Sequence, residues 1–264
     1  MFKSLLADGH HKLIRWRFIT HGGIDGYSRL IVYLKCSGNN EGRTAYENFT
    51  NAVSEYGLPS RVRSDCGMEN YMVARHMLQY HGLNHGSAIT SSSTHNQRIE
   101  RLWCDLYQSV TKMYYHLFYF LEHHGLLDLL NEVHLYSLHY VYLPRINTAI
   151  SVFRDGWNNH GLRTMHNSTS RQLFVSGALQ LYHSGLAALD FFSDVDDSYG
   201  IDEEEESPMP EEPESVVIPE STIHLPPEHL ELLQQRINPL AICDDHAVGM
   251  YESTVQLVES FLNS

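Results

Sequence analysis

The sequence predicts an α/β fold in which a mixed β-sheet is flanked by helices. The prediction comes from the order of the predicted elements: strand-like stretches come first, and helices and short strands then alternate along the chain. Strands that follow one another directly usually pair antiparallel, whereas strands joined through a helix usually pair parallel, so this order indicates a mixed sheet. An acidic segment and two short helical stretches follow the sheet domain.

The first strand-like stretches lie on either side of a predicted turn at Asp25-Gly26. Residues 15–21 are rich in β-branched and aromatic side chains, and residues 28–36 alternate as a strand does. The elements that follow are predicted to be a helix at residues 44–56, a strand at 60–64 that ends at Asp65, a helix at 70–81 and a strand at 87–90.

A further helix is predicted to begin at a capping box, Thr94 to Gln97. Glu100 lies near its start, and apolar residues follow at helical spacing: Ile99, Leu102, Trp103, Leu106, Val110, Met113 and Leu117. Trp103 is expected to be a core or dimer contact. More helix is expected after Gly125, including residues 146–157.

The charge is distributed very unevenly along the chain. Residues 1–193 hold 17 of the 18 Lys and Arg residues but only 14 of the 32 Asp and Glu residues, so this part is mildly basic and the rest strongly acidic. Residues 193–220 are rich in Asp, Glu, Pro and Ser and are expected to be disordered. Residues 225–238 and 248–262 show weak helical periodicity. We therefore expect a core at 1–185, an acidic linker at 186–222 and a helical tail at 223–264.

Several classes of protein are disfavoured by composition. The four cysteines, Cys36, Cys66, Cys104 and Cys243, form no C-x-x-C pair, which argues against a zinc ribbon or a disulfide framework. No run of 18 apolar residues is present, so no membrane helix is expected. These features favour an intracellular protein.

Two carboxylates stand where α/β proteins expose functional side chains. Asp65 ends a predicted strand and Glu100 lies near the start of a predicted helix. Carboxylates are the ligands that Mg²⁺ and Mn²⁺ prefer, and a two-metal site for phosphoryl transfer needs at least three of them. A third acid is therefore required.

Four segments in this order resemble retroviral and transposon integrase cores. Residues 62–70 (VRSDCGMEN) resemble the S-D-x-G-x-E/F segment, and residues 94–101 (THNQRIER) resemble the Q-G-x-x-E helix start that carries the last acid. Residues 24–31 (IDGYSRLI) are similar to the I-D-x-x-S-R second strand. Residues 158–164 (NNHGLRT) are similar to the Y-N-x-x-R-x-H segment, altered but in place.

The resemblance covers about residues 8–180 and implies an RNase H-like fold with a five-stranded sheet. It also implies metal-dependent polynucleotidyl transfer on DNA, descent from a mobile element and a nuclear location. Asp8, Asp65 and Glu100 would be the catalytic residues and would hold Mg²⁺ or Mn²⁺. DNA is then the expected partner, no membrane is involved, and a homo-oligomer is left open.

The first acid has two candidates. Asp8 fits the family's first strand, and Asp25 is the alternative, because it lies in the I-D-x-x-S-R segment of the second strand. Asp25 would otherwise make a hydrogen bond at a turn, with Arg29 as a partner. Only seven residues precede Asp8, so its strand is expected to be short.

Gln97, Arg98 and Arg101 are the candidate DNA contacts, against a capping role for Gln97 and a solvated helix face for the two arginines. Two alternative functions stay open. One is a catalytically inactive, integrase-derived module that binds DNA or protein. The other is a nuclease that cleaves RNA·DNA hybrids without joining DNA.

Overall fold

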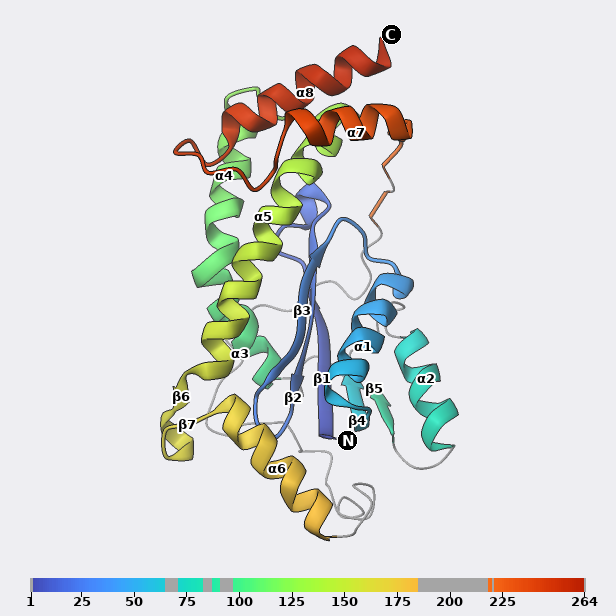
Figure 1. Ribbon diagram of the computed structural model, residues 1–264, viewed down its shortest axis with the longest axis vertical. Coiled ribbons are helices and arrows are strands. Elements are labelled where there is room, and N and C mark those ends of the chain that lie inside the picture. The colour runs from blue at the N-terminus through green and yellow to red at the C-terminus, as the bar shows by residue number, and fades with distance from the viewer. Residues whose placement is uncertain are drawn as a thin grey trace.

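The computed structural model describes residues 2–64, 71–82, 87–90, 97–184, 218–219 and 221–263 (Figure 1). Asp65 and the first three capping-box residues, Thr94 to Asn96, lie outside the described residues, as does nearly all of the predicted acidic linker. The linker's predicted disorder and the three predicted domain boundaries therefore stay predictions.

Five strands form one mixed sheet with the order β3-β2-β1-β4-β5. They are β1 (Phe2–His10), β2 (Ile19–Asp25), β3 (Ile31–Ser37), β4 (Pro59–Ser64) and β5 (Ala88–Thr90). β2 pairs antiparallel with both β1 and β3, whereas β4 pairs parallel with β1 and with β5. The predicted five-stranded mixed sheet and RNase H-like fold are confirmed.

Three details of the strand prediction are wrong. β1 is nine residues long rather than short. Residues 15–21 do not form one strand, because Ile14–Trp16 is a 3-10 helix that ends at Arg17, whose φ is 62°, and β2 begins only at Ile19. β3 begins three residues later than expected, because the Asp25 carboxylate accepts hydrogen bonds from the backbone and hydroxyl of Ser28 and holds that segment in a turn.

Helices cover both faces of the sheet and give two separate cores. On one face α1 (Gly42–Tyr56) and α2 (Tyr71–His81) pack on side chains of β1, β3 and β4. On the other face α3 (Gln97–Leu106), α4 (Lys112–His123) and α5 (Glu132–Asn159) enclose the larger core (Figure 1). Neighbouring residues of β1 point to opposite faces, so Leu5 and Ala7 belong to the first core and Leu6 to the second.

The predicted helix that carries Glu100 is long and continuous. A π-helical turn at Tyr107–Thr111 joins α3 to α4. Ile99, Leu102 and Leu106 are fully buried as predicted, but Met113 is 44% exposed, because the π turn changes the helical phase that the regular spacing assumes. α5 is also longer than predicted and begins at Asn131, whose side chain accepts a hydrogen bond from the Val133 backbone.

The chain leaves α5 through β6 (Gly161–Leu162), a 3-10 turn at Arg163–Met165 and β7 (Ser168–Thr169), and then forms α6 (Ser170–Ser184). α6 was not predicted. The expected helical tail is present as α7 (Pro227–Arg236) and α8 (Val248–Leu262).

The tail helices pack against the N-terminal half of α5 (Figure 1). The Tyr251 hydroxyl donates to the Leu126 carbonyl at 3.0 Å, and Arg145 on α5 donates to the Ala241 carbonyl at 2.6 Å. The tail is therefore a docked part of the fold. Among the described helices, none has both the length and the apolar character that a membrane crossing requires.

Candidate active site

Asp8 lies on β1, the central strand of the sheet, and faces α3. It is directly opposite Gly22 of β2, and its carboxylate is partly exposed. The Asp8 Oδ1 atom accepts a hydrogen bond of 2.8 Å from the Gly9 backbone, while Oδ2 accepts one of 2.9 Å from the Trp103 indole N–H. Each carboxylate oxygen can accept more than one bond, so these contacts orient Asp8 and leave it capacity to bind a cation.

Trp103 is held in place by two residues near Asp8, one on β1 and one on β2. Its indole stacks on His10, with ring centroids 5.2 Å apart and an interplanar angle of 19°. Gly22 allows this close approach, because a Cβ atom there would lie only 2.5 Å from the indole ring. Trp103 is 4% exposed and packs in the larger core, so of the two roles predicted for it, core or dimer contact, the structure shows the first.

Glu100 lies one helical turn before Trp103 on α3 and is partly exposed. Residues three apart on a helix point to the same side. Glu100 and Trp103 lie on the same side of α3, and Trp103 is hydrogen-bonded to Asp8. Glu100 therefore lies on the side of α3 that faces Asp8 on β1.

The third predicted acid, Asp65, lies outside the described residues. Ser64, the residue before it, ends β4 and pairs with Ala7, the residue before Asp8. Within the part of the chain that the structure describes, no group of three or more His, Cys, Asp or Glu residues forms a potential metal site. Two of the three predicted ligands, Asp8 and Glu100, are included in that part.

Asp25, the alternative first acid, is in a different environment. It is 2% exposed, lies opposite Leu5 at one end of the β1–β2 pair, and accepts hydrogen bonds of 2.8 and 2.7 Å from the Ser28 backbone and hydroxyl. Burial raises its pKa, although the Ser28 hydrogen bonds act in the opposite direction. The side-chain partner of Asp25 is thus Ser28, where the sequence suggested Arg29.

Burial also changes the titration of two groups near Asp8. His21, opposite Gly9, has its pKa lowered to about 4, because burial disfavours the charged imidazolium. The pKa of Tyr33 is raised by burial and, to a smaller extent, by the negative charge of Asp8. Both side chains are therefore neutral at pH 7.

The three predicted DNA contacts lie along the first turns of α3. Gln97 is the first described residue of this helix. Arg98 turns toward the β2–β3 connection and donates to the Gly26 carbonyl. Arg101 is exposed and lies 3.4 Å from Asp105 on the same helix.

Sequence reasoning missed the contact between Trp103 and Asp8. The signal was present in the spacing, because Trp103 follows Glu100 by three residues and must share its side of the helix. The spacing alone does not reveal which strand the indole meets.

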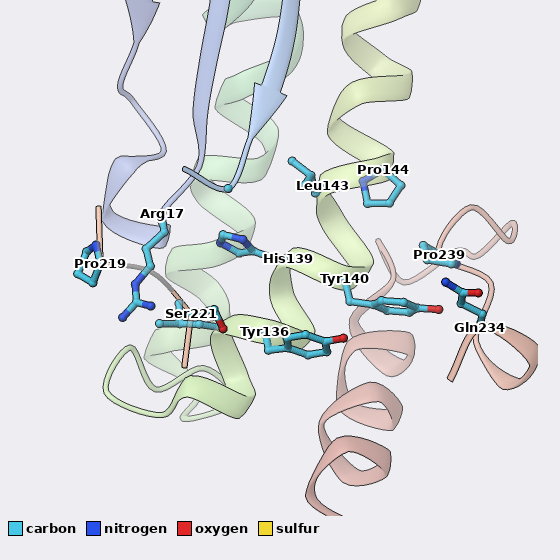
Figure 2. Close-up of a pocket in the computed structure, with 12 residues that line it drawn as sticks. Arg17, Tyr136, His139, Tyr140, Leu143, Pro144, Pro219, Ser221, Gln234 and Pro239 are labelled. Atoms are coloured by element: carbon cyan, nitrogen blue, oxygen red, sulfur yellow. The ribbon is translucent and has the colours of Figure 1, made fainter. Parts of the chain in front are cut away.

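A large cavity of about 570 Å³ lies elsewhere, between α5 and the C-terminal segment (Figure 2). Its lining includes the rings of Tyr136, His139 and Tyr140 and the guanidinium of Arg17, which is paired with Glu132 at 2.7 Å. None of the predicted site residues is among the residues that line this cavity.

Solved structures that resemble this chain are integrases of T-cell lymphotropic viruses. The HTLV-2 integrase catalytic core domain in complex with magnesium, in its trimeric form, is 16% identical with a TM-score of 0.43, over 65% of this chain and 95% of that one. Its dimeric form gives 15% identity and a TM-score of 0.42 over the same shares. A chain of the simian T-cell lymphotropic virus intasome in complex with PP2A regulatory subunit B56 gamma is 15% identical with a TM-score of 0.43, over 65% of this chain and 54% of that one.

No curated protein matches the sequence. The sequence profile of the family described as "Integrase core domain" matches residues 4–188, which include β1 from Ser4 onward, the other four strands of the sheet and α3. The chain belongs to the integrase core domain family.

Proposed function

We propose that residues 4–188 catalyse metal-dependent polynucleotidyl transfer on DNA, either strand transfer or nicking, with Asp8, Asp65 and Glu100 as the catalytic residues. The observation that carries the proposal is the hydrogen bond from Trp103 to Asp8, because it links the helix of Glu100 to the strand of Asp8. Two acids that are 92 residues apart in the sequence thereby face the same region.

The register of the sheet supports Asp65 as the third acid. Ala7 and Ser64 are paired across the parallel β1–β4 ladder, and Asp8 and Asp65 are the next residues in their chain segments. Asp25 has no such relation, since it lies opposite Leu5.

The donor set fits Mg²⁺ or Mn²⁺. Carboxylate oxygens are the ligands that these hard cations prefer, and both Asp8 and Glu100 keep part of their surface open to solvent. The metal would provide Lewis-acid stabilisation of the attacking and leaving oxygens at the phosphodiester.

The chain's own residues would orient this site. The Gly9 backbone and the Trp103 indole each hold one oxygen of Asp8, which fixes the plane of the carboxylate. His10 and Gly22 fix the indole in turn. Supporting residues of this kind usually set how well a carboxylate binds a metal.

Metal binding can be tested without activity. We expect Mn²⁺ to raise the melting temperature of the wild-type protein, because a ligand that binds only the folded state stabilises it. The shift should be lost in Glu100→Gln and kept in Glu47→Gln, which removes an exposed carboxylate on α1. If all three proteins respond equally or none responds, the metal site is wrong and the inactive DNA-binding or protein-interaction module is favoured.

The reaction is tested with labelled duplex DNA and a labelled RNA·DNA hybrid in Mg²⁺ or Mn²⁺. We expect nicking or joining of DNA that disappears in Glu100→Gln. Cleavage of the hybrid alone would instead identify a hybrid nuclease. A nuclear location stays part of the proposal, and light scattering would decide whether the protein forms a homo-oligomer.

A further inference from the structure

A second, smaller cavity lies beside α3 and has a different chemical character from the Asp8 region. Its volume is about 180 Å³. Three separate parts of the fold contribute to it: the β2–β3 connection, α3, and the end of α5 with β6. The lining residues are Arg29, Arg98, Arg101, Asp105, Trp157, His160 and Leu162.

The described residues that line the cavity carry a net positive formal charge. They include three arginines and one carboxylate, which gives a formal charge of +2 before any charge on His160. The carboxylate, Asp105, pairs with Arg101 at 3.4 Å, and the two side chains are 40% and 55% exposed. A long, exposed pair of this kind is weak, so it does not prevent Arg101 from binding an anion.

The backbone at Arg29 is held in an unusual conformation. Its φ is 60°, in the left-handed region that residues other than glycine seldom occupy. The Arg29 amide donates to the Asp25 carbonyl at 2.8 Å, and its carbonyl accepts from the Trp157 indole at 2.9 Å. Strained residues that are fixed from two sides often occur at binding sites. These contacts set the place from which the Arg29 side chain reaches the cavity.

The cavity and the proposed active site both include residues of α3. Each helical residue turns by about 100°, so Arg98, Arg101 and Asp105 share one side of α3, whereas Glu100 and Trp103 share another. The solvent-exposed face of α3 lies between these two sides, and Arg101 is exposed there. A DNA strand that crosses this face can therefore contact both the pocket arginines and Glu100.

We propose that this pocket binds a backbone phosphate of the DNA strand whose reacting phosphodiester lies at Asp8 and Glu100. The proposal rests on the proposed function and deepens it, because it names how the substrate is positioned. Guanidinium groups match the oxygens of a phosphate and make strong charge-assisted hydrogen bonds with them. Contacts of this type fix the register of DNA without reading its sequence.

The test measures DNA binding and not catalysis. Labelled duplex DNA is titrated by fluorescence anisotropy in EDTA over a range of salt concentrations. We expect Arg101→Gln to weaken binding and to reduce the slope of log K against log salt by about 1, as the loss of one phosphate contact does. Asp105→Asn should have the opposite effect on affinity, because it removes the one carboxylate among the described residues that line the pocket.

Arg43→Gln is the matched control. Arg43 also pairs with a carboxylate four residues on, Glu47, at 3.0 Å on an exposed helix face. Its affinity and salt slope should equal those of the wild type. Arg98→Gln is a second pocket variant, and its melting temperature is compared because Arg98 also bonds to the Gly26 carbonyl.

The outcomes separate this proposal from the proposed function. If Arg101→Gln and Asp105→Asn bind DNA like the wild type, or if Arg43→Gln is weakened as much as Arg101→Gln, the pocket proposal is wrong. Metal-dependent DNA nicking that Glu100→Gln abolishes would still stand in that case. If the wild type binds no DNA at all, both proposals are wrong.

Discussion

Asp25 lies at one end of the antiparallel β1–β2 pair and Asp8 lies three residue pairs further along it, and the surroundings of the two carboxylates differ in kind. Asp8 is partly exposed, and both of its oxygens are oriented by neighbouring donors. Asp25 is buried and uses its carboxylate to close the turn at Ser28, with a raised pKa that burial causes. A carboxylate that binds a cation must stay accessible and charged, whereas one that supports a turn needs neither property. The difference therefore favours Asp8 as the functional acid.

The largest expected effect comes from mutating these two aspartates separately. We expect Asp8→Asn to reduce DNA nicking or joining by at least about 10³-fold with little change in stability, because it removes a group that acts in the transition state. Asp25→Ala should instead lower the free energy of unfolding by about 2 kcal/mol, since it leaves the buried Ser28 amide without its acceptor. Activity assays and urea denaturation measure the two effects.

Asp25→Asn serves as the conservative control, because it keeps an oxygen that can accept from Ser28. If the folded Asp25 variants lose activity while Asp8→Asn keeps it, the two aspartates have been assigned the wrong way round.

The next effect is the pH dependence of stability that arises from His21, which lies opposite Gly9 on β1. The pKa of His21 is about 4 in the folded protein, where the side chain is buried, and 6.5 in the unfolded chain. Between these two pH values the unfolded chain therefore binds more protons than the folded protein. Stability should be highest above pH 6.5 and should fall by on the order of 3 kcal/mol as the pH drops toward 4.

Denaturation at several pH values measures this loss. His21→Gln should flatten the dependence, while His116→Gln, which changes an exposed histidine on α4, should not. An unchanged profile in His21→Gln would show that acid destabilisation arises elsewhere, for example at His139, whose pKa burial also lowers.

The smallest effect tests how Asp8 is held. We expect Trp103→Phe to weaken Mn²⁺ binding by about 10-fold, because it removes a hydrogen bond to a proposed ligand. Trp157→Phe is the control, since it removes an equivalent indole bond to the Arg29 carbonyl. Calorimetric titration with Mn²⁺ compares the variants. Equal affinities in the two variants would show that Trp103 only fills space.

Much of the fold could be predicted because local patterns report local structure. The strand at residues 60–64, the helix at 44–56 and the tail helices appear close to their predicted positions. Errors occurred where a distant contact or a special backbone conformation decided the outcome. The turn at Ser28 delays β3, and the π turn after Leu106 exposes Met113.

In the candidate site, too, local sequence patterns predicted some features and only the structure revealed others. Glu100 was found from a helix start and Asp8 from a family pattern, and both depend on neighbours in the sequence. The contact between Trp103 and Asp8 joins residues 95 apart. No periodicity within a segment predicts such a contact, because it depends on how α3 packs on β1.

The sequence by itself determined the order of elements, the family and the concentration of acidic charge in the C-terminal part, since spacing, motifs and composition are local properties. Only the tertiary structure decided that Asp8 stays open while Asp25 is buried, that Arg98 turns toward Gly26, and that Arg29 and Arg101 line one cavity. The reason is physical: burial and charge at a site are set by strand register and helix packing, which bring together residues that no local pattern connects.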